Sequence, residues 1–209
     1  HTTVGPTYGV VTNPMALGSG GTEGRGAGAI MIVATGSVTV NGIISANGAA
    51  TVNTGGAGGS INITASSLTG TGTIRANGGS ATSYGCGGGG RIAFSISGPD
   101  SFAGAIEVKG GGVVNVNSGY RGSAGTVWLS QQKRDNLTLG GVGNMMTLRL
   151  GTDDVMGPFM VTNYVFGTLT IETNGLLEID GNPFTNVVNA VANGVASVLQ
   201  VGTLEVKSG

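Results

Sequence analysis

The chain has 209 residues, of which 43 are glycine, 9% are charged and 5% are aromatic, and its formal net charge is −1. Its 9 basic residues are scattered, so it lacks the basic patch that nucleic-acid binding requires. No apolar run approaches the length of about 18 residues that a membrane-spanning helix needs. The length fits one domain or one rod.

Residues 1–25 differ in pattern from the rest of the chain. Pro6 and Pro14 cannot donate a ladder hydrogen bond, so only residues 8–12 read as a strand. We expect an irregular strap that folds back along the molecule or reaches a neighbouring copy. The chain starts at His1 without an initiator methionine or a signal peptide, which suggests a processed chain or an excised fragment.

Residues 26–130 repeat a short pattern of strand and turn residues. The repeat is clearest in three residues that return 30 or 31 positions later: Ile30, Ile44 and Asn47 recur as Ile61, Ile74 and Asn77. Short runs of alternating polarity, bounded by glycine and asparagine without helical stretches between them, are typical of solenoids. We therefore predict an all-β fold, a parallel β-helix (β-solenoid) with an irregular N-terminal strap.

Strand alternation assigns side chains to the inside or the outside of this solenoid. Glycine is expected at corners, where it permits positive φ. Asn47 and Asn77 occupy equivalent corners, either as turn residues or as a hydrogen-bonded ladder. The residues expected inside are Ile30, Ile32, Ile61, Ile63, Ile92, Phe94, Val127 and Leu129, and those expected outside are Met31, Asn62, Ala93 and Trp128.

Residues 131–209 read as a less regular continuation of the same solenoid. Residues 131–136 are polar and are expected to form an exposed loop. Residues 184–199 keep helical spacing, but their β-branched content and Gly194 favour a strand. Further strands are expected at 146–150, 168–171, 176–179 and 203–206.

The repeat resembles a known group of proteins. The run GAGGSINITA at 56–65, GTIRANGG at 72–79 and GRIAF at 90–94 resemble the glycine-rich repeats of large secreted and surface-anchored prokaryotic proteins. Those repeats form right-handed parallel β-helices. The resemblance covers about residues 16–130, and the last third only through its strands. It implies an extracellular or cell-surface location and a structural or adhesive role, and it carries over no catalytic residue.

The sequence offers little for catalysis or metal binding. His1 is the single histidine and Cys86 the single cysteine, which leaves no second histidine for a copper site and too few ligands for ordinary zinc sites. Cys86 reads as a small corner residue, with an intermolecular disulfide as the alternative. Asp153 and Asp154 form the one acidic cluster, either a solvated turn or a weak calcium site. We expect no enzyme activity and no cofactor.

Two kinds of surface residue are candidates for contact or modification. Trp128 is expected outside, packed under the strap or a loop, in a subunit contact, or as a platform for stacking a sugar. Asn62 and Asn136 each begin an Asn-x-Thr sequon and are expected to be accessible to glycosylation.

The function predicted from these observations is that of an extracellular structural subunit. Residues 202–209 repeat the opening of a coil without a polar capping repeat, so we expect copies to stack head to tail into a filament, sheath or surface layer. The alternatives are an adhesin or carbohydrate-binding stalk, with surface polysaccharide as the partner, and a polysaccharide-degrading enzyme with converging carboxylates. The expected self-assembly residues are Tyr8, Val10, Val11, Met15, Leu17, Leu204 and Val206.

Overall fold

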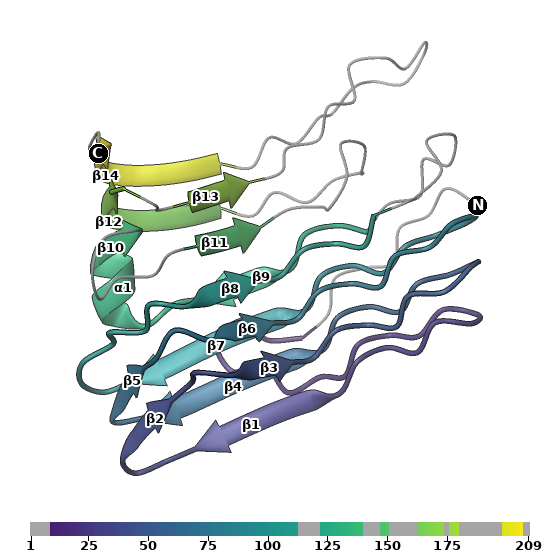
Figure 1. The fold of residues 1–209 in the computed structure, drawn as a ribbon, viewed down its shortest axis with the longest axis horizontal. Coiled ribbons are helices and arrows are strands. Elements are labelled where there is room, and N and C mark those ends of the chain that lie inside the picture. The colour runs from purple at the N-terminus through teal and green to yellow at the C-terminus, as the bar shows by residue number, and fades with distance from the viewer. Residues whose placement is uncertain are drawn as a thin grey trace.

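The computed structural model of the chain describes residues 9–112, 122–139, 147–150, 163–173, 176–179 and 198–206. Within these ranges nearly every element is a strand, every strand pair is parallel, and the coils stack one above another (Figure 1). The chain is therefore a parallel β-solenoid, which confirms the predicted fold class. The predictions for Tyr8 and for Asp153 and Asp154 fall outside the described residues, as do those for 184–199 apart from Val198 and Leu199.

The strands form four sheets in which neighbours come from successive coils. One sheet contains β1 (Ala29–Val33), β4 (Ser60–Ala65), β7 (Arg91–Ile96) and β9 (Thr126–Trp128). A second pairs β2 (Ser37–Thr39) with β5 (Ser67–Thr69). A third contains β3 (Ile43–Ser45), β6 (Thr73–Arg75), β8 (Ala105–Glu107), β11 (Thr147–Leu150) and β13 (Leu176–Ile179). The fourth contains β10 (Asn136–Leu139), β12 (Asn163–Ile171) and β14 (Val198–Val206).

Aliphatic side chains stack in register through the interior of the coils. Ile61 and Ile92 are paired in the first sheet and both are fully buried, as is Ile74 in the third sheet. Burial stabilises such a side chain by about 1.5–3 kcal/mol relative to leaving it in water. The predicted inward positions are confirmed. Two of the continuous inner rows are Ile30, Ile61, Ile92 and Val127, and Ile44, Ile74, Ile106, Leu148 and Leu177.

Beside the strands, the glycine-rich segments form extended chains that hydrogen-bond to several neighbours. The amides of Ala57, Gly58 and Gly59 donate to three different segments, at Ser19, Gly88 and Ala46 respectively. Backbone amides whose directions recur every third residue are typical of a threefold extended helix of the polyproline II type, which has no internal hydrogen bonds. We call this region the glycine arm; it comprises residues 16–27, 46–59, 76–90, 108–112 and 122–125.

Close packing explains the glycines of the arm. A Cβ added to Gly56 would lie 2.0 Å from the carbonyl oxygen of Arg25, and one added to Gly87 would lie 1.8 Å from that of Gly56. The expectation that glycine permits positive φ at corners applies only to Gly9 and Gly70 among the described glycines, so it does not explain the others. At Gly56 and Gly87 the backbones approach so closely that a side chain has no room.

The asparagine corners form a ladder between side chains and backbone. The side-chain oxygen of Asn47 accepts a hydrogen bond from the amide of Asn77 at 2.8 Å, and that of Asn77 accepts one from the amide of Lys109 at 2.8 Å. The Asn77 side-chain amide also donates to Glu107 at 3.0 Å. The predicted ladder of one asparagine side chain on the next does not form; each side-chain oxygen accepts instead from a backbone amide of the next coil, which ties each corner to that coil.

One predicted loop is a helix. Residues 131–136 were expected to be an exposed loop, but α1 (Gln131–Asp135) occupies this stretch, and the side chain of Lys133 is buried. The Ser130 hydroxyl caps the helix by accepting from the amide of Lys133 at 3.4 Å. The four strands expected at 146–150, 168–171, 176–179 and 203–206 are confirmed as β11, part of β12, β13 and part of β14.

Candidate functional site

The first coil has an unpaired edge. Within the described residues, β1, β2 and β3 each pair with one strand, in the second coil. The Gly28 carbonyl accepts from Ser60 and the Ala34 amide donates to Thr64, so even-numbered residues here face the second coil. Because backbone groups alternate along a strand, those of Ala29, Met31 and Val33 face the open edge. The edge therefore offers a row of donors and acceptors to another parallel strand.

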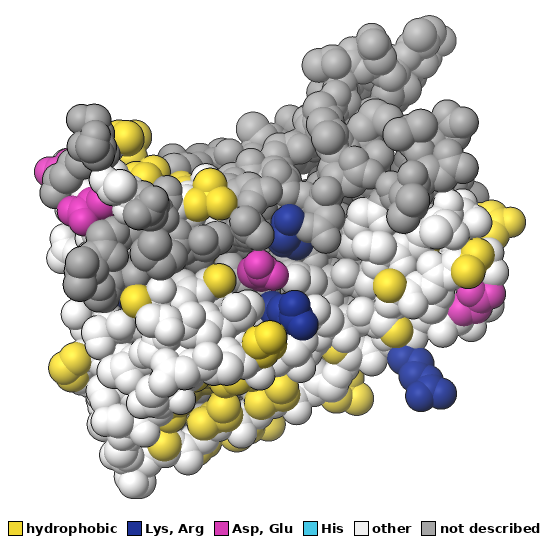
Figure 2. Space-filling model, viewed as in Figure 1, with side chains coloured by type: hydrophobic (Ala, Val, Ile, Leu, Met, Phe, Trp, Pro, Cys, Tyr) yellow, Lys and Arg dark blue, Asp and Glu magenta, His cyan; other side chains and the backbone are white. Residues whose placement is uncertain are grey.

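The inner layer of the first coil is also uncovered on this side. Ile30, Ile32, Val38 and Ile44 pack against the core but remain partly exposed, whereas Ile61 and Ile63 one coil further on are fully buried. Hydrophobic side chains line this edge of the molecule in Figure 2. The first coil therefore presents both an unpaired ladder and an apolar cross-section.

The last described coil is open in the same way. In the described part of the chain β14 pairs only with β12, placing Leu204 beside Leu169 and Val206 beside Ile171. Leu169 is fully buried, so Leu204 and Val206 belong to the next inner layer, yet they are 58% and 70% exposed. Both predicted contact residues thus lie at an uncovered end of the solenoid.

The strap lies on its own solenoid. The Ala16 carbonyl accepts from the Ser60 hydroxyl at 2.6 Å and from the Arg91 guanidinium at 3.3 Å, which holds residues 9–18 across β4 and β7. No strand forms in the described part of 8–12, contrary to the prediction. The described part of the strap, residues 9–18, thus lies along the molecule. The expected contact residues Val10, Val11, Met15 and Leu17 are exposed on its surface.

The strap changes the environment of one predicted glycosylation site. Asn62 points away from the core, but it is only 5% exposed because its side chain donates a hydrogen bond to Asn13 of the strap. The expectation that Asn62 is accessible is therefore wrong for the folded chain. Asn136 is exposed, as expected, at the start of β10.

Trp128 is partly buried, and the side chain that covers it comes from α1. The Arg134 guanidinium lies 3.9 Å from the centre of the Trp128 ring, a cation–π contact. Neither the strap nor a long loop supplies this contact. One face of the ring is thus already occupied within the chain, which leaves less of it for stacking a sugar.

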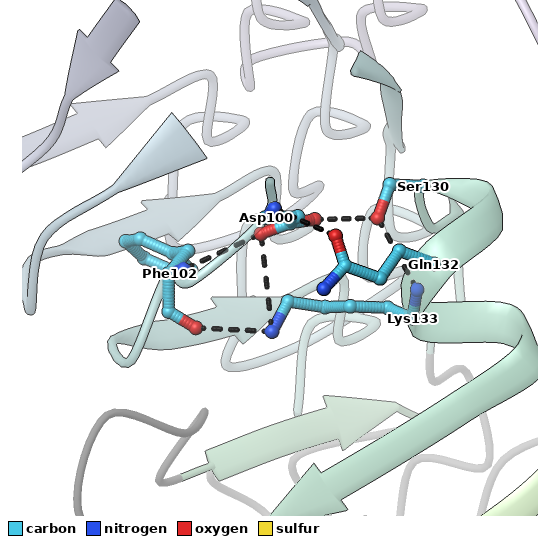
Figure 3. Close-up of polar contacts among 5 residues, drawn as sticks. All are labelled: Asp100, Phe102, Ser130, Gln132 and Lys133. Atoms are coloured by element: carbon cyan, nitrogen blue, oxygen red, sulfur yellow. Dashed lines mark hydrogen bonds and ion pairs between the residues drawn. The ribbon is translucent and has the colours of Figure 1, made fainter. Parts of the chain in front are cut away.

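A buried polar cluster connects α1 to the third coil (Figure 3). Lys133 Nζ lies 3.8 Å from Asp100 Oδ1 and donates to the Phe102 carbonyl at 3.2 Å. The other oxygen of Asp100 accepts from the Ser130 hydroxyl at 2.5 Å, and its backbone amide donates to Gln132 at 2.9 Å. Burial lowers the pKa of Lys133, and the negative charge of Asp100 offsets part of that effect. Both charged groups of this cluster are paired inside the chain, so the cluster serves to position α1. Sequence reasoning missed it because the two charges lie 33 residues apart.

The described residues contain no group of three or more histidine, cysteine or acidic side chains that could hold a metal ion. Cys86 lies in the glycine arm, where its thiol donates to the Gly112 carbonyl at 3.1 Å. No helix among the described residues is long and apolar enough to cross a membrane. The open ends are therefore the feature of the described chain most suited to an interaction.

Comparisons with known proteins found no matching family, no similar curated protein and no similar solved structure.

Proposed function

We propose that this chain is an extracellular structural subunit that stacks end to end on copies of itself, forming a filament, sheath or surface layer. The observation that carries the proposal is the uncovered inner layer at both ends, with Ile30 and Ile32 at one end and Leu204 and Val206 at the other. The proposed location rests on the resemblance of the glycine-rich repeats to those of secreted and surface-anchored proteins. No catalytic role is proposed.

A second copy suits these ends for reasons of geometry. All the strands among the described residues run parallel, so the last coil of one copy can continue the sheets of the next with the same hydrogen-bond pattern. The contact joins two different surfaces of the same chain, and contacts of this type repeat without closing unless the rotation forms a ring. Stacking also buries two apolar layers against each other, which supplies the hydrophobic driving force.

Met31→Pro tests the proposal. Proline removes the Met31 amide, which faces the open edge, and it leaves the hydrogen bonds of β1 to the second coil intact. We expect the full-length wild-type chain to form long polymers in electron microscopy and sedimentation, and Met31→Pro to remain monomeric or very short at the same concentration.

Met31→Leu is the matched control, because it keeps both the amide and the apolar character and should polymerise like the wild type. Thermal unfolding of the Met31→Pro monomer shows whether the solenoid itself is preserved. A wild-type chain that stays monomeric at high concentration would contradict the proposal, and so would a Met31→Pro variant that polymerises normally.

A further inference from the structure

The outer surface of the first coil is more apolar than the same surface one coil further on. Val33 is in register with Thr64, and Ile43 with Thr73. Val33 and Ile43 are 70% and 65% exposed and point outward, as their threonine partners do. At equivalent positions, therefore, the first coil carries aliphatic side chains where the second coil carries hydroxyl groups.

Two further positions show the same change. Met31, which is 51% exposed, is in register with Asn62. Val52, which is 63% exposed, lies opposite Thr82, since the neighbouring residues form a bridge and Thr82 donates to the Val52 carbonyl. We call Met31, Val33, Ile43 and Val52 the rim. Its members lie on two different sheets and in the glycine arm, so they surround the first coil rather than forming a flat patch.

The far end of the solenoid repeats this feature. In the third sheet one row of registered positions reads Ile43, Thr73, Ala105, Thr147 and Leu176. Only the two ends of this row are large and aliphatic, and Leu176 is 39% exposed. End-to-end stacking brings the two ends of the row to the same junction. A neighbour packed against the side of the solenoid would give no reason for the large aliphatic residues to occur only at the row's ends.

We propose that the rim is the outer part of the junction between copies, and that the coils at the C-terminal end of a second copy, including Leu176, cover it. This inference rests on the proposed stacking and adds the side chains that give the junction its strength. Backbone pairing alone is available to any edge strand, so it cannot distinguish this chain's own end from another strand. Apolar contact around the perimeter adds affinity, and it also makes the junction selective for a second copy of this chain.

The test replaces the rim with residues that the second coil already uses. The triple variant Val33→Thr, Ile43→Thr, Val52→Thr keeps β-branched side chains and all backbone amides, so the solenoid should fold with an unchanged melting temperature. We expect the concentration needed for polymerisation of the full-length chain to rise about tenfold or more, because three apolar side chains lose their burial at each junction. Leu176→Thr should raise it in the same direction from the opposite end.

Tyr84→Thr is the control, because Tyr84 is also exposed, at 60%, but belongs to the second coil's part of the arm and is not a member of the rim, although its amide donates to Asn53, next to Val52. It should leave polymerisation unchanged. If the wild type polymerises and Met31→Pro blocks it while the triple variant polymerises at the wild-type concentration, the rim inference is overturned and the stacking proposal stands. If the wild type does not polymerise, both fall. If the triple and Leu176→Thr variants combine with less than additive effect, the two sites meet at one junction.

Discussion

Gly87→Ala is expected to lower the free energy of unfolding by about 3 kcal/mol, the upper part of the range for overpacking a tight interior. The added methyl group would lie 1.8 Å from the carbonyl oxygen of Gly56, a backbone atom that cannot rotate away. Gly87 also links two coils, since its amide donates to Gly79 and its carbonyl accepts from Gly111. Displacing Gly87 would therefore strain several neighbouring segments of the glycine arm. Chemical denaturation monitored by circular dichroism measures the change.

Gly85→Ala is a control in the same segment. A Cβ at Gly85 meets no atom within 4 Å, and Gly85 is not among the glycines with positive φ. Alanine there should be neutral or should stabilise by up to about 1 kcal/mol through the unfolded chain. Equal losses for the two variants would show that glycine acts in the arm through backbone freedom and not through close packing.

Lys133→Met is expected to cost about 3–5 kcal/mol of folding stability, the range for removing one partner of a buried ion pair. The variant leaves the Asp100 carboxylate buried without its cation, although the Ser130 hydroxyl and the Phe102 amide still donate to it. The double variant Asp100→Asn, Lys133→Met removes the stranded charge and should recover part of the loss. A cost below about 1 kcal/mol for Lys133→Met would mean that the pair contributes no more than an exposed one.

The pKa of Lys133 also predicts a pH dependence of stability. Burial lowers this pKa below its ordinary value of 10.5, so the unfolded chain binds the proton more tightly than the folded chain does. The free energy of unfolding contributed by this group should therefore rise with pH in the range just below 10.5. Comparing the pH profiles of the wild type and Lys133→Met isolates the effect, since the variant lacks the group. Parallel profiles would contradict it.

The solenoid could be predicted because its core residues recur at a regular spacing along the sequence. Ile61 and Ile92 recur 31 residues apart, alternate with outward residues and therefore fall into one inner row. The asparagine corners could be predicted for the same reason. The sequence could not distinguish a turn from a ladder, because both place asparagine at the same positions. Only the structure shows the Asn47 side chain accepting from the next coil.

The glycine arm and α1 could not be predicted in the same way. A chain with threefold symmetry has no alternation of apolar residues to reveal it. The available signal was the spacing of glycine pairs, Gly55 with Gly56 and Gly58 with Gly59, three residues apart. The helix is too short to show a period, and its buried lysine is explained by Asp100 in another coil. The rim could be recognised only once the strand register was known. It depends on comparing Ile43 with Thr73, the residue in register with it on the second coil.

The parallel register has a mechanical consequence for any polymer built from this chain. Neighbouring coils within one copy are joined by hydrogen bonds and also by the covalent chain that winds from one to the next. A junction between copies has the hydrogen bonds and apolar contacts without that covalent path. Tension along the axis should therefore rupture the polymer at junctions first, releasing intact subunits whose ends can join again.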